Sequence, residues 1–90
     1  MIRQSSVSTP ELSEAILATL RRVVPAAPSQ IDPESPFRDQ FEMDSLDFLN
    51  FIVSLEKEHA VKIPERRYPR CASLAGATKV LEEALAAAVR

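Results

Sequence analysis

The residues with the clearest potential for chemistry stand at the start of the most apolar segment of the sequence, residues 42–58. There, Asp44 and Ser45 come directly before Leu46 and a long apolar run. A serine in this place lies beside the first turn of a predicted helix, where free backbone N–H groups and the helix dipole favour a phosphate. The pattern therefore predicts covalent modification of the Ser45 hydroxyl. The simpler alternative is that Ser45 only caps the helix.

The sequence contains few other reactive side chains. Its one cysteine, Cys71, cannot form a disulfide within the chain, and with the single histidine, His59, it does not complete a zinc-type ligand set. There is no Gly-x-Ser-x-Gly turn and no phosphate-binding glycine loop. We therefore predict no metal site and no catalytic residues, and a hydrolase with Ser45 as nucleophile is the least favoured class. Cys71 is interpreted as a small buried hydrophobic residue, and His59 as a residue favoured by a helix C-terminus.

The composition predicts one small, all-α domain. The sequence is 46% hydrophobic and 27% charged, which is typical of a folded globular chain. A single glycine and no tryptophan, together with many alanines and leucines, favour helices over a sandwich rich in glycine turns. The sequence has no signal-like or membrane-spanning apolar run, and its net charge is only −2. These features predict a cytoplasmic protein that neither inserts into membranes nor binds nucleic acid.

The first helix is expected to begin with Thr9 as its N-cap and Pro10 in the first helical position. Apolar residues then recur at three- and four-residue spacing. Pro25 ends the helix, because the residue before a proline disfavours the α region. Residues 1–8 are predicted to be a flexible lead-in, and residues 9–90 a single domain.

A long connection is predicted at residues 25–44. It contains four prolines and shows neither a helical nor a strand period. Ser35 and Pro36 suggest one helical turn within it. Its large apolar residues are expected to anchor it over the core: Ile31, Phe37 and Phe41.

Three further helices complete the pattern. The second runs from Ser45 to about His59 and has a wide apolar arc, which predicts contact with more than one neighbour and a central place in a bundle. A brief helix is expected at residues 64–68, closed by Pro69. The last helix should start near Ser73, as its N-cap, and continue to the end of the apolar pattern.

This order of elements resembles that of a stand-alone acyl carrier protein, over residues 9–85. The most specific features are the Asp44-Ser45-Leu46 triplet at a loop-to-helix boundary and the Ile63-Pro64 pair after the second helix. The resemblance implies a small all-α four-helix bundle, with three main helices, a short third helix and a long proline-rich loop between helices 1 and 2.

The resemblance also implies a function. Ser45 would carry 4′-phosphopantetheine, transferred from coenzyme A by a phosphopantetheinyl transferase, and the thiol of this arm would hold an acyl group as a thioester. Asp44 would take part in recognition by the transferase. The chain would be a non-catalytic, monomeric carrier that presents acyl intermediates to a loading ligase and to downstream synthases and transferases.

Partner recognition is expected on the second helix and the region that follows it. In the family, an apolar residue past the modified serine and several acids on the second helix contact partner enzymes; the matching acids are Asp47, Glu56 and Glu58. The third-helix region is basic here, which predicts partners other than the common ones of fatty-acid synthesis, in a specialised lipid or polyketide-like pathway. The predicted partner-binding residues are Leu46, Asp47, Asn50, Glu56, Lys57, Arg66 and Arg67.

Two alternative functions stay open at this stage. The chain could be an aminoacyl or peptidyl carrier, or it could be a helical interaction module without a prosthetic group, whose acidic and basic halves bind partner proteins. For a carrier, the size of the cargo is also in question. Crowding by Phe48, Phe51 and Leu55 predicts limited sequestration of long acyl chains.

Overall fold

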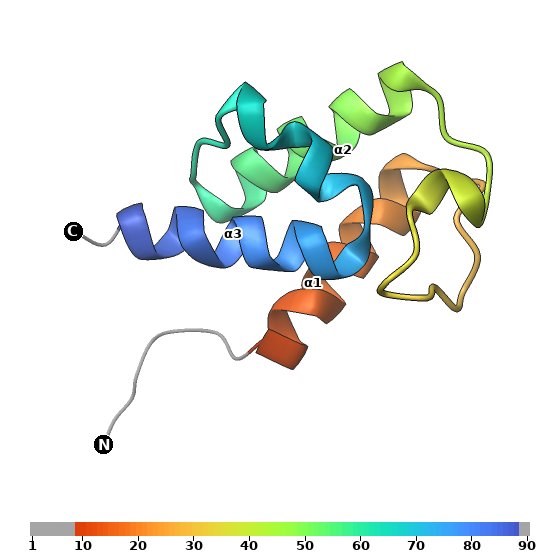
Figure 1. Cartoon of the computed structure of the whole chain (residues 1–90), viewed down its shortest axis with the longest axis horizontal. Coiled ribbons are helices and arrows are strands. Elements are labelled where there is room, and N and C mark those ends of the chain that lie inside the picture. Colours follow the sequence, from red (N-terminus) through yellow and green to blue (C-terminus); the bar gives the residue numbers. More distant parts are fainter. Residues whose placement is uncertain (1–8, 89–90) are drawn as a thin grey trace.

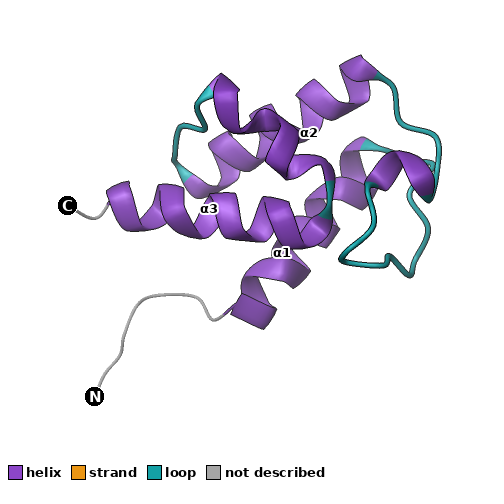
Figure 2. Ribbon diagram, viewed as in Figure 1, coloured by secondary structure: helices purple, strands orange, loops and turns teal. Residues whose placement is uncertain are grey.

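The computed structural model describes residues 9–88 (Figure 1). Its elements follow in the order α1 (Thr9–Val23), η1 (Phe37–Asp39), α2 (Ser45–His59), η2 (Glu65–Ala72) and α3 (Leu74–Ala88), where η denotes a 3₁₀-helix. Figure 2 shows helices and loops but no strand in this range, which confirms the all-α class with its short third helix. None of the helices in residues 9–88 is long and apolar enough to cross a membrane. The lead-in predicted at residues 1–8 lies outside the described residues.

α1 packs against both α2 and α3. It ends just before Pro25, as predicted, but it begins at Thr9, which is therefore the first helical residue and not the N-cap. The Thr9 hydroxyl instead donates a hydrogen bond to Glu82 of α3. The apolar residues that α1 buries are spaced four apart on one face of the helix: Leu12, Ile16 and Leu20.

α2 has the bounds that the sequence predicts, but it buries less of its apolar arc than expected. Phe51, Ile52 and Leu55 are fully buried, whereas Leu49 and Val53 are 45% and 43% exposed. A small domain has a large surface for its volume, so one side of a helix meets the core and the other side meets solvent. The apolar arc of α2 therefore splits into a buried stripe and an exposed one.

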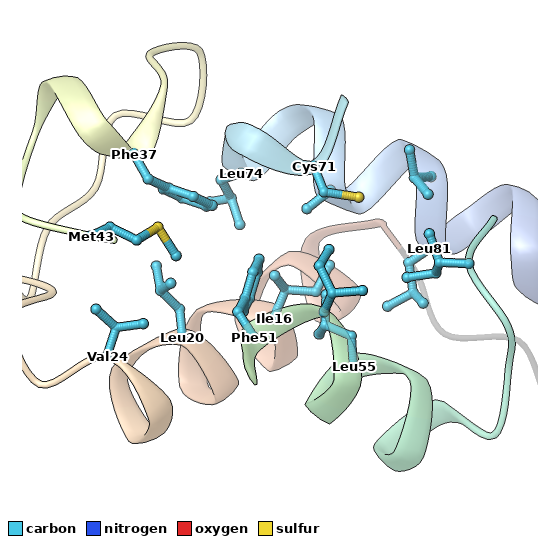
Figure 3. Close-up of a cluster of buried hydrophobic side chains, with 14 of the residues drawn as sticks. Ile16, Leu20, Val24, Phe37, Met43, Phe51, Leu55, Cys71, Leu74 and Leu81 are labelled. Atoms are coloured by element: carbon cyan, nitrogen blue, oxygen red, sulfur yellow. The ribbon is translucent and has the colours of Figure 1, made fainter. Parts of the chain in front are cut away.

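Phe37 anchors the long loop to the core, as predicted. Its ring lies edge-on to that of Phe51 in α2, with centroids 5.6 Å apart and an interplanar angle of 87°, a favoured aromatic geometry. Figure 3 shows Phe37 and Met43 reaching from the loop toward Phe51. η1 is the single helical turn expected after Pro36. The other two predicted anchors are partly buried against the same core: Ile31 and Phe41.

A hydrogen-bond network inside the loop centres on Gln40, which the sequence does not single out. Its amide nitrogen donates to the carbonyl oxygens of Asp32 and Ser35, both at 2.9 Å, and its amide oxygen accepts from the Asp32 N–H at 2.7 Å. The Pro33 carbonyl accepts from the Ala75 N–H of α3 at 2.9 Å. These bonds satisfy backbone groups that a helix or strand would otherwise pair. The loop therefore has a fixed path to the start of α2.

η2 extends further than predicted, to Ala72 instead of ending at Pro69. Proline breaks an α-helix through its missing N–H and its ring, but its fixed φ lies within the range of a 3₁₀-helix. η2 therefore loses a hydrogen bond at Pro69 and continues. Ser73 then caps α3, as predicted, because its Oγ accepts from the Gly76 N–H at 3.1 Å.

The close packing of α3 on η2 depends on Gly76. A Cβ atom at this position would lie 1.9 Å from the carbonyl oxygen of Arg70. That oxygen belongs to the backbone of η2, so it cannot rotate away as a flexible side chain would. The single glycine of the chain therefore stands where two backbones approach each other.

Two potentially reactive side chains, those of Cys71 and His59, are packed against other parts of the fold. Cys71 is fully buried, and burial raises the pKa of its thiol to about 11, so it is protonated at neutral pH. Its interpretation as a small buried hydrophobic residue is confirmed. His59 has a buried Nε2 atom without a hydrogen-bond partner among residues 9–88. Burial lowers the pKa of His59, so the predicted favourable effect of the helix C-terminus on its charge is wrong, because desolvation outweighs the helix dipole.

We expect Gly76→Ala to destabilise the protein by about 1–3 kcal/mol, because the added methyl group collides with the backbone of η2. Thermal unfolding followed by circular dichroism measures the change. Lys79→Ala, an exposed substitution on the same helix, is the control and should stay within about 0.5 kcal/mol of wild type. A Gly76→Ala protein as stable as this control would show that the contact can open without cost.

We also expect His59 to make stability depend on pH. The unfolded chain takes up a proton near the ordinary histidine pKa of 6.5, whereas the folded chain does so only at lower pH. The unfolded state then binds more protons in this interval, so the free energy of unfolding falls as the pH drops through about 6.5. His59→Gln should reduce this fall, measured as the difference in Tm between about pH 7.5 and about pH 5.5. An equal fall in both proteins would assign the effect to the carboxylates.

Candidate functional site

Ser45 is the first residue of α2, and its side chain is exposed. The helix is capped by Asp44, whose backbone is extended with φ −90° and ψ −179°. Asp44 Oδ1 accepts from the Asp47 N–H at 2.8 Å, and Asp47 Oδ2 accepts from the Asp44 N–H at 3.3 Å. This reciprocal capping box fixes the start of α2. Because the two aspartates supply the cap, the Ser45 hydroxyl is not needed for it.

The first turn of α2 suits a phosphate group attached at Ser45. The backbone N–H groups of Ser45 and Leu46 have no hydrogen bond within the described part of the chain. They also lie at the positive end of the helix dipole, which stabilises a nearby anion. An enzyme can reach the exposed hydroxyl directly from solvent. The residues present therefore fit a group linked to Ser45 through a phosphodiester.

A groove of about 960 Å³ lies beside Ser45. The residues just after α1, the last part of the loop and the first turn of α2 line it, and Arg38 is the basic residue among its lining residues. Its acidic residues are Asp39, Glu42, Asp44 and Asp47. The last two are engaged in the capping box, so the carboxylates left for other contacts are those of the loop. The surroundings of Ser45 are therefore acidic on the loop side.

A smaller pocket of about 280 Å³ opens between the loop, α2 and η2. Arg38 and Met43 line both this pocket and the groove beside Ser45, so the two spaces adjoin. The other lining residues are mostly apolar: Pro36, Phe37, Phe48, Pro69 and Ala72. The pocket therefore offers an apolar chain attached at Ser45 a small site next to the groove.

The predicted partner-binding residues are distributed along α2 and η2. Three of them are exposed on α2: Leu46, Asn50 and Lys57. On η2, Arg66 is exposed, and Arg67 forms an ion pair with Glu83 of α3. The structure thus brings Leu46 and Asp47 together with Asp44 and Ser45, and it places the remaining residues further from Ser45.

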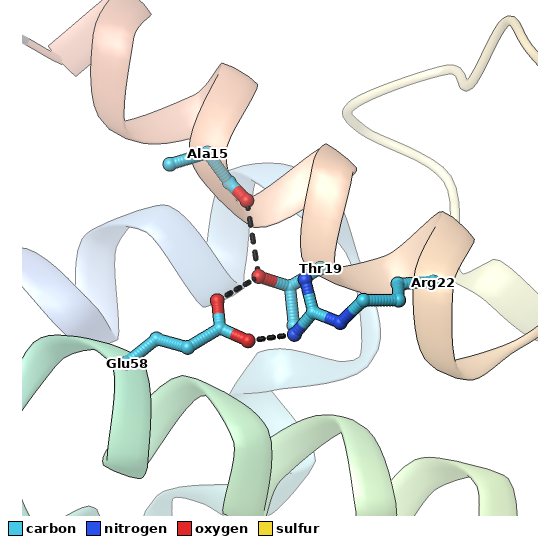
Figure 4. Close-up of polar contacts among 4 residues, drawn as sticks. All are labelled: Ala15, Thr19, Arg22 and Glu58. Carbon is cyan, nitrogen blue, oxygen red and sulfur yellow. Dashed lines mark hydrogen bonds and ion pairs between the residues drawn. The ribbon is translucent and has the colours of Figure 1, made fainter.

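The two acids near the C-terminal end of α2 bond to other segments of the fold, although Glu58 is exposed. Glu56 Oε2 accepts from the Ile63 N–H at 2.8 Å. Glu58 forms an ion pair with Arg22 of α1, and its Oε1 lies 2.6 Å from Thr19 Oγ1 (Figure 4). Thr19 is buried, so the contact also satisfies a hydroxyl group within the core. These carboxylates connect α2 to neighbouring segments. The sequence pattern did not indicate these contacts.

Sequence reasoning missed Leu49 and Val53 as candidates for partner binding. Both are exposed, and they follow Leu46 at three- and four-residue spacing. At 100° per residue, the three side chains fall in one narrow sector on the side of α2 away from Phe51 and Leu55. The three- and four-residue spacing of these residues is the sequence pattern that distinguishes the exposed stripe of α2 from the buried one.

Comparison with known proteins assigns this site to a family. A family model described as the phosphopantetheine attachment site matches residues 14–81. The acyl carrier protein of Brachyspira hyodysenteriae is 36% identical over 55 residues, which are 61% of this chain and 70% of that protein. Acyl carrier protein 2, mitochondrial, of Arabidopsis thaliana is 25% identical over 73 residues, which are 81% of this chain and 58% of that protein. A meromycolate extension acyl carrier protein of Mycobacterium leprae is 33% identical over 60 residues, 67% of this chain and 52% of that protein.

The aligned part of this chain thus covers 52% to 70% of the length of these relatives. The segment that matches the family model includes Ser45, all of α2 and all of η2. It also includes most of α1 and the first half of α3, so that each helix of the fold takes part in the match. The chain therefore belongs to the acyl carrier protein family, whose members bear a covalently attached 4′-phosphopantetheine.

Proposed function

We propose that this chain carries acyl groups as thioesters on a 4′-phosphopantetheine attached to Ser45. The observation that supports this best is an exposed serine hydroxyl at a helix start whose cap comes from Asp44. In loading, the bond between Ser45 Oγ and phosphorus forms, the bond from that phosphorus to the adenosine bisphosphate part of coenzyme A breaks, and the hydroxyl proton leaves. The thiol of the attached arm provides the thioester linkage.

Asp44 has two roles in this proposal. It caps α2 through the Asp47 N–H and so orients the backbone of Ser45. Its side chain is also exposed next to Ser45, where the transferase has to bind. The chain itself is not catalytic: it is the substrate of a phosphopantetheinyl transferase, and later it presents the acyl group to other enzymes.

The further partners are a loading ligase and downstream synthases or transferases of a specialised lipid or polyketide-like pathway. The basic residues of η2 support this choice, because Arg66 and Arg70 are both exposed. Charge complementarity decides which partners associate. The relatives named as meromycolate extension carriers lend further support to a specialised pathway. We propose that the protein acts as a monomer in the cytoplasm.

The apolar pocket supports a short acyl cargo. At about 280 Å³, it lies below the range of about 300–1,000 Å³ that is typical of sites for drug-sized ligands. Its lining includes the bulky Phe48 of α2 and Pro69 of η2. A short chain can therefore be enclosed, whereas the end of a long chain remains in solvent or in the partner enzyme. This agrees with the limited sequestration expected from the bulky side chains of α2.

The attachment site is tested by intact mass after incubation with coenzyme A and a broad-specificity phosphopantetheinyl transferase. We expect wild type to gain one phosphopantetheine and Ser45→Ala to gain none, because no other residue would be the acceptor. Ser54→Ala, which changes another serine of α2, is the matched control and should be loaded like wild type. If wild type stays unmodified under conditions that load a known carrier, the interaction module without prosthetic group becomes the better interpretation.

The cargo size is tested by the rate at which hydroxylamine cleaves the loaded thioester. We expect the butanoyl thioester on the protein to react several-fold more slowly than butanoyl-pantetheine, and the hexadecanoyl thioester to react at the rate of its free counterpart, because only the short chain fits. Ala72→Leu fills part of the pocket and should remove the protection of the butanoyl group. Strong protection of the hexadecanoyl thioester would contradict the proposal of a short cargo.

A further inference from the structure

Arg38 is the one basic side chain that lines the groove beside Ser45 or the apolar pocket that adjoins it, and it lines both. It is exposed, and its side chain forms no hydrogen bond or ion pair within residues 9–88. A guanidinium group has five N–H donors in a planar fork, which suits carboxylates and phosphates. Arg38 is therefore a cationic group near the start of α2 that the fold itself does not use.

The place of Arg38 is set by its buried neighbour Phe37. The ring of Phe37 packs edge-on to that of Phe51, with centroids 5.6 Å apart (Figure 3). The carbonyl oxygen of Phe37 accepts from the N–H groups of Gln40 and Phe41, at 2.9 and 3.0 Å. Phe37 is buried in the core whereas Arg38 is exposed. The turn therefore holds the backbone of Arg38 firmly and leaves its side chain on the solvent side.

The groove beside Ser45 is an unfavourable place for a further negative charge. Four carboxylates belong to its lining: Asp39, Glu42, Asp44 and Asp47. A phosphodiester on Ser45 is an anion at neutral pH and would be repelled by them. The helix dipole of α2 offsets this repulsion only in part, because it is equivalent to roughly half a positive charge. Arg38 supplies a full positive charge in the same groove.

From this placement we infer that Arg38 is the counter-ion of the phosphodiester on Ser45. The inference rests on the proposed function, because the phosphodiester exists only after Ser45 has been loaded. Arg38 is a positioning residue in this role: it donates hydrogen bonds to the phosphate oxygens and takes no part in bond formation. Because Arg38 also lines the apolar pocket, an arm held at its base by Arg38 begins next to the site that can enclose a short acyl chain.

The test compares the Tm of the full chain before and after loading with coenzyme A and a broad-specificity phosphopantetheinyl transferase. Intact mass verifies that each protein is loaded to completion. Arg38→Gln removes the charge at an exposed position, so the variant should fold. The matched control is Arg70→Gln, which removes an exposed arginine of η2 that lines neither space. The difference between loaded and unloaded Tm cancels any effect of a substitution on the unloaded fold.

We expect loading to shift Tm less favourably in Arg38→Gln than in wild type, by about 1–6 °C at about 0.05 M NaCl, because the phosphodiester then lacks its counter-ion. The discrepancy should shrink at about 0.5 M NaCl, since salt screens an exposed ion pair. Arg70→Gln should behave like wild type. Arg38→Lys should lie between, because lysine keeps the charge but lacks the fork. The ³¹P resonance of the phosphodiester should move in Arg38→Gln and stay in place in Arg70→Gln.

Three outcomes on a loaded chain would overturn the inference. The first is an equal effect of loading on the Tm of Arg38→Gln and of wild type. The second is a ³¹P resonance that is the same in both proteins. The third is a discrepancy in Tm that persists undiminished at about 0.5 M NaCl, which would assign the effect to packing of the arginine stem instead of its charge. A wild-type chain that is not loaded at all would instead refute the proposed function.

Discussion

The position of Ser45 depends on the contact between Phe37 of the long loop and Phe51 of α2. Both rings are buried, and each contributes about 1.5–3 kcal/mol through loss of apolar surface to water. The edge-on geometry adds about 0.5–1.5 kcal/mol. The loop has no periodic backbone pairing to hold it, so this anchor, with the bonds around Gln40, fixes its path. The fixed path of the loop in turn fixes the position of Asp44 at the start of α2.

Glu56 and Glu58 of α2 bond to other segments of the fold. A carboxylate on a helix surface is commonly solvated, and its ion pairs contribute little to stability. Glu58 is different, because it joins α1 to α2 through Arg22 and through the buried hydroxyl of Thr19. Glu56 likewise holds the connector that follows the helix, at the Ile63 N–H. These two acids therefore connect α2 to α1 and to the segment that follows the helix.

The features that the sequence predicted are those set by residues within about one helical turn. The start of α2 and the cap at Ser73 depend on side chains that bond to backbone only three residues away. The errors have tertiary causes. Pro69 continues η2 because its φ suits a 3₁₀-helix, and His59 is desolvated by packing that no local pattern reveals. The role of Gln40 depends equally on how the loop folds back on itself.

The two faces of α2 differ in how much a substitution costs in stability. Truncating a fully buried residue such as Phe51 or Leu55 to alanine typically costs about 2–5 kcal/mol, a large part of the stability of a small domain. Changing an exposed residue such as Val53 usually costs less than about 0.5 kcal/mol. The exposed residues Leu46, Leu49 and Val53 can therefore change at little cost in stability, while the capping box keeps Ser45 in place. The apolar arc that looked like one surface in the sequence is thus two surfaces with different constraints, and only the inner one is fixed by the packing of the core.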